Sequence, residues 1–343
     1  MRPQTRAEFK IAIICALPHE ADAVEALFDE TYDTLGRFFG KQPGDINAYA
    51  NGRIGDHDVV LCHLPGKGKG SAASAASSLV MSYTEVDLAL GVGVYGGVPS
   101  PSEDIEIALG DVIISDTVIE LDFGGQYPDG FRRTTDVKDT LGRPNREIRA
   151  LLEGLKTRTA RKELQGMIAT NLLALHAEDE TMWQYPGAEH DVLFEISYRH
   201  RHQKGKRHRP CICYRRKSSN DPVCDGAPNS DCVTLKCSGK PVYRTRPNAK
   251  QTSPHIHIGT IASADTVMKS GKHRDNLALT DKIIGFEMEG AGVRDNVPCL
   301  IIKGVCDYAD SHKNKIWQSY AAATEACVAK AFLKFWRPAS KES

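Results

Sequence analysis

Short apolar runs rich in β-branched residues recur along the chain, and segments with the 3.6-residue period of a helix separate several of them. The apolar runs predict buried strands at 10–16, 58–64, 86–92, 111–118, 256–263 and 298–306. The periodic segments predict helices at 19–30, 70–83, 145–156, 159–177 and 317–335. Strands that alternate with helices indicate an α/β fold, which we expect to be a single domain over residues 10–336 with three layers, α/β/α, around a central mixed sheet.

Residues 199–253 break this pattern, because they are basic, poor in aliphatic side chains and rich in turn residues. This composition predicts an irregular insertion, and the flanking segments 192–198 and 254–263 could pair across its base as neighbouring strands. A structural zinc site is conceivable here, but the cysteine spacing is not that of a standard zinc ribbon. A mobile surface excursion with free thiols is the favoured alternative. The cysteines in question are Cys211, Cys213, Cys224, Cys232 and Cys237.

The composition narrows the classes of partner. The 343 residues are 41% hydrophobic, which is enough to bury a sizeable core without disulfides or metals. Lysine and arginine number 44, as do aspartate and glutamate, so the net charge of zero favours a small ligand over nucleic acid or an anionic membrane. No signal peptide and no apolar run of about 18 residues is present, so we expect a cytoplasmic protein. The remaining cysteines are expected to be buried thiols: Cys15, Cys62, Cys299, Cys306 and Cys327.

Two glycine-rich segments resemble nucleotide-binding loops. Residues 91–96 satisfy G-x-G-x-x-G after a strand, but Pro99 and Pro101 follow at once, so no helix can begin in the register that a dinucleotide site needs. Residues 66–71 lie between a strand and a helix without fitting the phosphate-loop motif. Their amides could face a ligand, or the segment could be a turn that allows close helix packing.

Neither metal-dependent alternative is supported by a motif. The aspartate cluster that would hold calcium in another class of nucleoside hydrolases is missing, and so is the H-x-E and P-C-x-x-C pair of a zinc deaminase. We therefore expect no catalytic metal and no cofactor.

Two acidic segments are the strongest candidates for chemistry. Residues 286–292 (FEMEGAG) and 303–310 (KGVCDYAD) place carboxylates beside small residues at the ends of apolar elements. Open α/β sheets bind ligands at strand ends, and clustered carboxylates there suit acid and base catalysis. The alternative is that they are solvated turn acids that cap helices.

With four further motifs, these segments resemble the purine and uridine phosphorylase superfamily, which includes the bacterial methylthioadenosine/S-adenosylhomocysteine nucleosidases, and most closely its fungal branch. The six motifs occur in the family's order and cover most of residues 10–335 outside the insertion. They are IAIICALPHEADAV, GVGVYGGV, ALGDVIISD, IGTIASADTVMK, FEMEGAGV and KGVCDYADSHKNKIWQSYAAATEA.

The resemblance implies a role for each carboxylate. Asp307 would be the general acid that protonates or hydrogen-bonds N7 of a purine. Glu289 would accept hydrogen bonds from the ribose hydroxyls, with Met288 packed on the sugar, and Glu20 would orient the attacking water. Lys303 could keep Asp307 ordered, or could form a simple surface ion pair.

The resemblance places the base near residues 265–268, where Val267 and Met268 would contact it. Val267 stands where the nucleosidases usually have an aromatic ring, so Phe123 or Tyr95 is expected to stack on the base instead. Cys306 likewise stands at a position that is usually serine. Three further residues are expected to contact the substrate, namely Glu287, Val94 and Gly96.

The same resemblance bears on the nucleophile. The family's phosphorylases carry arginine and serine where this chain has Gly91 and Val94, and a further arginine where it has Glu20. A carboxylate repels phosphate but can polarise water, so we expect hydrolysis of purine ribonucleosides to free base and ribose. Phosphorolysis is the alternative, for which Lys67 and Lys69 would supply the cations.

A third hypothesis is a non-catalytic nucleoside-binding module, because fungal relatives are often fused to nucleotide-binding and repeat modules. A chain of 343 residues leaves no room for such modules, so an enzyme is expected. The resemblance also implies a homodimer that acts in purine salvage.

Overall fold

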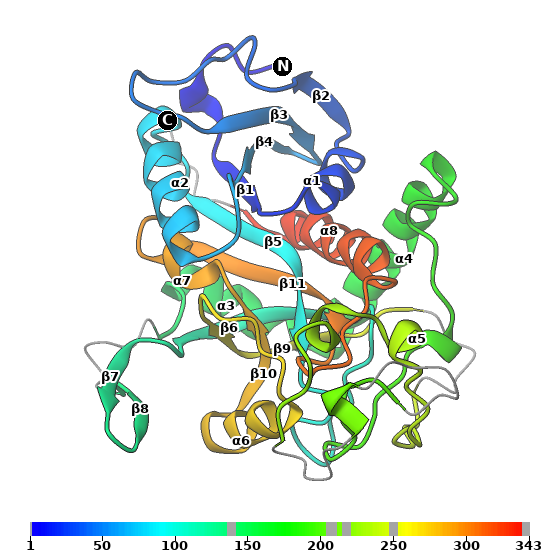
Figure 1. Ribbon diagram of the computed structural model, residues 1–343. Coiled ribbons are helices and arrows are strands. Elements are labelled where there is room, and N and C mark those ends of the chain that lie inside the picture. Colours follow the sequence, from blue (N-terminus) through cyan, green and yellow to red (C-terminus); the bar gives the residue numbers. More distant parts are fainter. Residues whose placement is uncertain (1, 136–141, 204–210, 215–220, 247–252, 338–343) are drawn as a thin grey trace.

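The computed structural model describes residues 2–135, 142–203, 211–214, 221–246 and 253–337 (Figure 1). The strands are β1 (Ile11–Cys15), β2 (Glu30–Asp33), β3 (Ala48–Ile54), β4 (His57–His63), β5 (Leu88–Gly97), β6 (Val112–Glu120), β7 (Gly124–Tyr127), β8 (Gly130–Arg133), β9 (Ile256–Ser263), β10 (Ile283–Glu287) and β11 (Cys299–Asp307). The α-helices are α1 (Pro18–Glu25), α2 (Lys69–Ser82), α3 (Arg146–Leu155), α4 (Arg158–Glu178), α5 (Cys232–Leu235), α6 (Gly271–Asp281), α7 (Gly290–Arg294) and α8 (Gln318–Phe335). Short 3₁₀ turns lie at Arg6–Glu8, Ala188–His190, Ile212–Tyr214 and Ala227–Asn229.

Nine of these strands form a mixed sheet in the order β10-β9-β6-β11-β5-β1-β4-β3-β2. In its middle, β4, β1, β5 and β11 run parallel, whereas β6 is antiparallel to β11. Strand β10 is parallel to β9 and also pairs antiparallel with the end of β5, so this half of the sheet curls back on itself. The curl brings the carboxyl ends of β5, β10 and β11 together.

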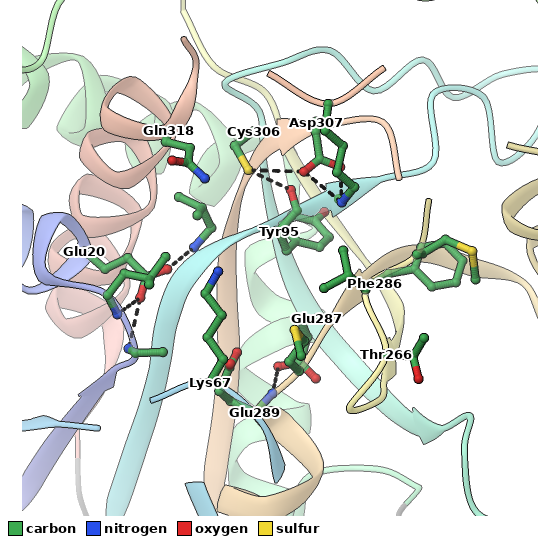
Figure 2. A pocket seen from close by; sticks show the side chains of 18 residues that line it. Glu20, Lys67, Tyr95, Thr266, Phe286, Glu287, Glu289, Cys306, Asp307 and Gln318 are labelled. Atoms are coloured by element: carbon green, nitrogen blue, oxygen red, sulfur yellow. Dashed lines mark hydrogen bonds and ion pairs between the residues drawn. The ribbon is translucent and has the colours of Figure 1, made fainter. Parts of the chain in front are cut away.

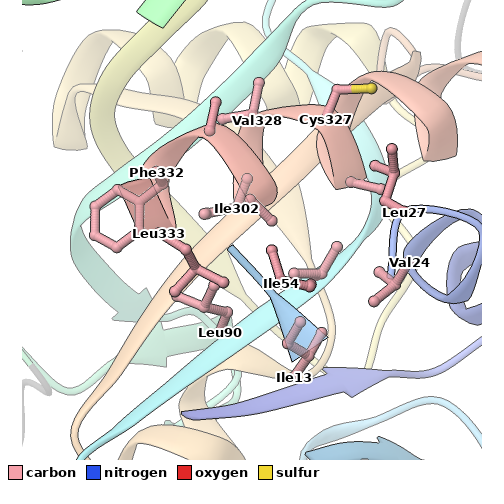
Figure 3. Close-up of a cluster of buried hydrophobic side chains, with 14 of the residues drawn as sticks. Ile13, Val24, Leu27, Ile54, Leu90, Ile302, Cys327, Val328, Phe332 and Leu333 are labelled. Atoms are coloured by element: carbon pink, nitrogen blue, oxygen red, sulfur yellow. The ribbon is translucent and has the colours of Figure 1, made fainter. Parts of the chain in front are cut away.

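Side chains alternate along every central strand, so the apolar strands present apolar side chains on both faces of the sheet. Helices cover each face and bury these side chains. Ile11 and Ile13 of β1 belong to the core under α1, α4 and α8, whereas Ala12 and Ile14 belong to the core under α2. Figure 3 shows Phe332 and Val328 of α8 packed over Ile302 and Leu90 of the sheet. The predicted three-layer fold with a central mixed sheet is thus confirmed.

The six predicted strands and five predicted helices are all present, with small differences at their ends. The first helix ends at Glu25 rather than at residue 30, because the chain turns there into β2. The cysteines expected to be buried thiols, outside the insertion, are buried. The sequence analysis missed β2, β3, β7, β8, β10, α6 and α7, which are short or rich in glycine and polar residues.

The expected pairing of the segments that flank the insertion is wrong. Residues 192–198 contain no strand and make one isolated bridge, between Phe194 and Pro241. The other flank is β9, which pairs with β6 on one edge and with β10 on the other. Strand β9 is paired with β6 along its whole length and with β10 over Thr260–Ser263, rather than with residues 192–198.

None of the helices in the described part of the chain is long and apolar enough to cross a membrane.

Asp111, which directly precedes β6, ties the insertion to the sheet. Its carboxylate accepts hydrogen bonds from Arg246 of the insertion at 2.8 Å, from His257 Nε2 at 2.9 Å and from the amides of Ala108 and His255 at 2.9 Å each. Burial alone would raise the pKa of Asp111, but the bonds from His257 and Arg246 outweigh it and hold the pKa at about 2. Asp111 is therefore a buried anion whose charge is fully matched.

We expect Asp111→Ala to lower the free energy of unfolding at pH 7 by about 1–3 kcal/mol, because it leaves Arg246, His257 and two backbone amides without the buried acceptor that they share. Since the folded-state pKa of Asp111 lies near 2, below its ordinary value of 3.8, its contribution is complete above about pH 4 and is lost as the pH falls toward 2. Urea unfolding at a series of pH values measures both effects. The control is Asp129→Ala, which removes an exposed ion pair with Arg132 and should leave stability nearly unchanged. Equal losses in both variants would contradict the assignment.

Candidate active site

A pocket opens where β1, β5, β10 and β11 end, at the edge of the sheet that the sequence analysis predicted (Figure 2). Its walls come from the turn into α1, the second half of β5, the segment after β9, the end of β10 and the loop after β11. Its lining residues are Ala16, Leu17, Glu20, Lys67, Val94, Tyr95, Gly96, Thr266, Val267, Met268, Phe286, Glu287, Met288, Glu289, Cys306, Asp307, Lys313 and Gln318.

Glu20 lies in the first turn of α1 and is 2% exposed. One carboxylate oxygen accepts hydrogen bonds from the amides of Ala16 at 3.0 Å and Leu17 at 2.8 Å, and the other accepts from the amide of Val94 at 2.8 Å. Three backbone donors therefore fix its orientation. A carboxylate offers about four acceptor positions, so one remains for a water or a ligand.

Glu289 lies at the start of α7, across the pocket from Glu20. Its carboxylate accepts a hydrogen bond from the amide of Gly68 at 3.3 Å and forms an ion pair with Lys303 Nζ at 3.3 Å. Burial alone would lower the pKa of Lys303, but Glu289 and Glu20 outweigh it and raise that pKa. Lys303 is thus a buried cation that faces the ribose-binding carboxylate predicted from the sequence.

This arrangement corrects the expectation for Lys303. The sequence analysis proposed that Lys303 orders Asp307 or forms a surface ion pair. Lys303 is 2% exposed, and the carboxylate it contacts is that of Glu289. Lys303 and Asp307 lie four residues apart on β11, but the pairing of β11 with β5 shifts its register between Val305 and Asp307, so regular alternation does not place the two side chains together.

Glu287 supports Glu289 from behind. Its carboxylate accepts hydrogen bonds from the amides of Glu289 at 2.9 Å and Gly290 at 2.7 Å, so it caps the first turn of α7. Burial raises the pKa of Glu287. Although Glu287 lines the pocket, these bonds make it a positioning residue for Glu289.

Asp307 ends β11 on the opposite wall. Its carboxylate accepts a hydrogen bond from the amide of Ala309 at 2.8 Å and pairs with Lys313 Nζ at 2.9 Å. The Cys306 thiol lies 3.6 Å from the same carboxylate and 3.5 Å from the carbonyl oxygen of Tyr95. The cysteine therefore occupies a hydrogen-bonding position, as the serine of the family pattern would.

The part of the pocket assigned to the base is apolar. Val267 and Met268 lie there as predicted, together with Thr266 and Phe286, and Tyr95 packs at its back with 4% exposure. Phe123 does not line the pocket; it is 48% exposed beside the hairpin β7–β8. Of the two rings proposed to stack on the base, only Tyr95 lies in the pocket.

The remaining predicted residues, Met288, Val94 and Gly96, all line the pocket. Sequence reasoning missed Lys313 and Gln318, although Lys313 stands inside the quoted motif KGVCDYADSHKNK. It also missed Glu325, a carboxyl group with no exposure that accepts a hydrogen bond from the amide of Gly304 at 2.9 Å. A single glutamate within the apolar stripe of α8 was the signal that could have identified it.

The two glycine-rich segments now have structural explanations. Strand β5 runs through residues 88–97 and the chain continues to β6 without a helix, which excludes a dinucleotide fingerprint. The amides of Gly68 and Lys69 donate to the carboxylates of Glu289 and Asp265. A Cβ added to Gly292 of α7 would lie 2.1 Å from the Lys69 carbonyl oxygen, so it is this glycine that permits the close packing of α7 against α2.

The two lysines of this segment differ. Lys67 lines the pocket, and Figure 2 shows its side chain extending into the cavity. Lys69 instead forms ion pairs with Glu120 and Asp122.

Comparisons with known proteins agree with this architecture. Residues 10–172 match the family model described as the phosphorylase superfamily. A nucleotide-binding leucine-rich repeat (NLR)-like protein of Hyaloscypha variabilis is 34% identical over 333 residues, which are 95% of this chain and 29% of that protein. The chain therefore spans less than a third of the length of this curated relative.

Two solved structures illustrate the likeness in fold. Futalosine hydrolase of Helicobacter pylori superposes with a TM-score of 0.55 at 15% identity, covering 95% of this chain and 98% of that chain. The 5′-methylthioadenosine/S-adenosylhomocysteine nucleosidase of Streptococcus pneumoniae, with a transition-state inhibitor, gives a TM-score of 0.54 at 19% identity, covering 95% and 99%. At these identities the two structures show a shared fold, and the match to the phosphorylase superfamily model covers residues 10–172 of this chain.

Proposed function

We propose that this protein hydrolyses the N-glycosidic bond of purine ribonucleosides, releasing the free base and ribose, without a metal or cofactor in the chemistry. The observation that carries the proposal is the convergence of Asp307, Glu289 and Glu20 on one pocket from three different elements, namely the end of β11, the start of α7 and the first turn of α1. Each carboxylate has a different environment, which suits three different roles.

Asp307 is assigned to the leaving base. It borders the apolar wall of Val267, Met268 and Phe286, where a planar base would lie against side chains that offer no hydrogen bonds. Proton donation to N7 allows the base to leave uncharged.

Glu289 is assigned to the ribose hydroxyls. Lys303 and the amide of Gly68 hold its carboxylate at the edge of the cavity, where acceptor positions remain for a ligand. Hydrogen bonds to the sugar that strengthen as the ring flattens toward an oxocarbenium ion would lower the barrier.

Glu20 is assigned to the water. Its three backbone donors hold the carboxylate rigid, so a bound water would be fixed in direction as well as in place. A water held between Glu20 and Glu289 would lie on the ribose side of the pocket, away from the base wall.

Three features of the pocket favour water over phosphate. Glu20 presents negative charge where a phosphate dianion would need cations. The amides of Gly68 and Lys69 already bind carboxylates, and Lys69 is committed to Glu120 and Asp122. A Cβ added at Gly91 would lie 2.6 Å from the terminal methyl group of Ile301, so an arginine at this position would require Ile301 to move.

Two alternatives each have one supporting observation. Phosphorolysis is favoured by Lys67, whose ammonium extends into the cavity. A nucleoside-binding module without turnover is favoured by the NLR-like relative, of which the matched part is 29%. The cytoplasmic location, the homodimer and a part in purine salvage stay predictions.

The nucleophile can be identified from the sugar product. In phosphate-free buffer, we expect adenosine, guanosine or inosine to yield free base and ribose, with uridine as the control that lacks a purine. Added phosphate should neither raise the rate nor produce ribose 1-phosphate. Strict dependence on phosphate would establish phosphorolysis through Lys67, and binding measured by calorimetry without any turnover would establish the module.

Asp307→Asn should lower the turnover number by about 10²–10⁴ while KM stays close to the wild-type value, because asparagine keeps the size of the side chain but cannot transfer a proton. Steady-state kinetics on the preferred purine nucleoside give both constants. The exposed Asp129→Asn serves as the matched control. A turnover number near that of the wild type would remove Asp307 as the acid.

Glu289→Gln should weaken both binding and turnover, since an amide is a poorer acceptor than a carboxylate for ribose hydroxyls. A 2′-deoxyribonucleoside, which lacks one hydroxyl, should lose less than the ribonucleoside. Thermal unfolding is followed in parallel, because the change leaves the Lys303 ammonium without its ion-pair partner. If both substrates suffer equally in a variant that stays folded, Glu289 does not contact the 2′-hydroxyl.

A further inference from the structure

Two groups of cysteines and histidines lie outside the pocket, and seven of their eight residues belong to the insertion at 199–253. The first group is His200, Cys232, Cys237 and His312, and the second is His202, Cys211, Cys213 and Cys224. In each group, one ligand atom from every member lies within 4.8 Å of all the others. The five insertion cysteines are thus divided between two compact sets, each completed by histidine.

The separations in the first group are those of a tetrahedral zinc site. Zinc–sulfur bonds of about 2.3 Å and zinc–nitrogen bonds of about 2.0–2.1 Å place neighbouring ligand atoms about 3.3–3.8 Å apart. His200 Nδ1 and His312 Nδ1 are 3.4 Å apart, and Cys232 Sγ lies 3.7 Å and 3.5 Å from them. Cys237 Sγ lies 3.8 Å from His200 Nδ1.

The second group has similar separations. His202 Nδ1 lies 3.7 Å from Cys211 Sγ and 3.3 Å from Cys224 Sγ. Cys213 is 2% exposed, and its sulfur accepts a hydrogen bond from the amide of Cys224 at 3.4 Å. An amide directed at a sulfur stabilises a thiolate, which is the form that binds a metal.

The hydrogen bonds of the two histidines in the first group also indicate a metal site. His200 Nε2 lies 2.7 Å from the carbonyl oxygen of Ser230, and His312 Nε2 lies 3.1 Å from that of Tyr198. A carbonyl accepts only, so each Nε2 carries the proton and each Nδ1 presents its lone pair to the other at 3.4 Å. Two facing lone pairs repel one another unless a proton or a metal ion lies between them, and a metal ion would also satisfy the two cysteine sulfurs that converge on the same point. Histidines that bind metals commonly donate their second nitrogen to a carbonyl.

The insertion also needs a cross-link. Its own hydrophobic cluster has three buried members, Cys213, Ala227 and Leu235, among the residues that the structure describes. A core of this size cannot hold a chain segment in one conformation, and small modules of this kind are commonly stabilised by metals or disulfides. A disulfide would use two sulfurs and leave the converging histidines unexplained.

We propose that the protein binds two structural zinc ions, one in each group. His200 and His202 lie on either side of a bend at Arg201, and each belongs to a different group, so each binds a different ion. Along the chain, all ligands of the second group, residues 202 to 224, lie between His200 and Cys232 of the first group. Neither group shares a residue with the pocket, so the zinc takes no part in the proposed hydrolysis.

The first zinc site also positions the acid, an inference that rests on the proposed function. His312 is the one ligand outside the insertion, and it neighbours Lys313, whose Nζ pairs with Asp307 at 2.9 Å. The insertion holds the same loop at a second point, where the buried pair of Arg244 and Asp191 bonds to the hydroxyl of Tyr308. His312 is therefore a positioning residue for Asp307.

The test begins with the metal itself. Full-length protein purified from zinc-supplemented culture is expected to contain two zinc ions per chain by inductively coupled plasma mass spectrometry, and modification of its thiols with a mercurial should release both. Substitution with cobalt should give the visible absorption of tetrahedral cobalt bound by thiolates. Absence of zinc, another metal in its place, or fewer than ten titratable thiols in the denatured, metal-free chain, as disulfides would cause, overturns the proposal.

Variants then separate the two sites. Cys232→Ser and Cys211→Ser should each lose one zinc, whereas the core variant Cys62→Ala should keep both. If His312 positions the acid, Cys232→Ser should lower the turnover number by up to about 10²-fold with KM little changed, and Cys211→Ser should not. Retention of two zinc ions by both variants overturns the metal sites, and equal turnover numbers in the two variants overturn the link to Asp307. The zinc content does not depend on which reaction the pocket performs, so failure of the proposed hydrolysis is a distinguishable result.

Discussion

The pocket depends on a buried cation. Lys303 is enclosed in the sheet, and the carboxylates of Glu289 and Glu20 raise its pKa against the effect of burial. Without this ammonium, the two carboxylates would repel one another with no cation to offset their charge. Its position on β11, next to β5, holds the two walls of the cavity at a fixed separation. Replacing it with an apolar side chain would leave Glu289 as an unpaired buried charge, which is far more costly than the loss of a surface pair.

The same constraint explains the glycines of β5 better than nucleotide binding does. A Cβ on Gly93 would lie 2.7 Å from Lys303 Nζ and 2.8 Å from a carboxylate oxygen of Glu20. A Cβ on Gly96 would lie 2.8 Å from a carboxylate oxygen of Asp307. The bare backbone of β5 is therefore the surface against which the charged side chains pack. A motif that looks like a dinucleotide fingerprint here makes room for protein charges.

The sequence predicted the central strands, the longer helices and the strand ends that carry carboxylates, because these depend on hydrophobic period and on order along the chain. Contacts between side chains on different strands were harder to predict. Lys303 meets Glu289 rather than Asp307, and Phe123 lies outside the pocket, because both outcomes depend on which strands are neighbours and on where a hairpin leaves the sheet. The two cysteine–histidine groups had no recognisable spacing for a related reason. One ligand, His312, comes from a loop far from the other seven in the sequence.

The loop after β11 connects the pocket with the insertion. It follows Asp307 on the pocket side and carries His312 on the insertion side, and Lys313, the next residue, pairs with Asp307. Ala309 adopts a left-handed conformation with a φ of 51°, which a residue with a Cβ tolerates only where its surroundings hold it. The contacts on Tyr308 and His312 supply that restraint from outside the sheet. A segment that at first resembles an unrelated insertion is therefore the part of the chain that fixes the direction of the proposed acid, and pocket and insertion must be kept compatible through this single loop.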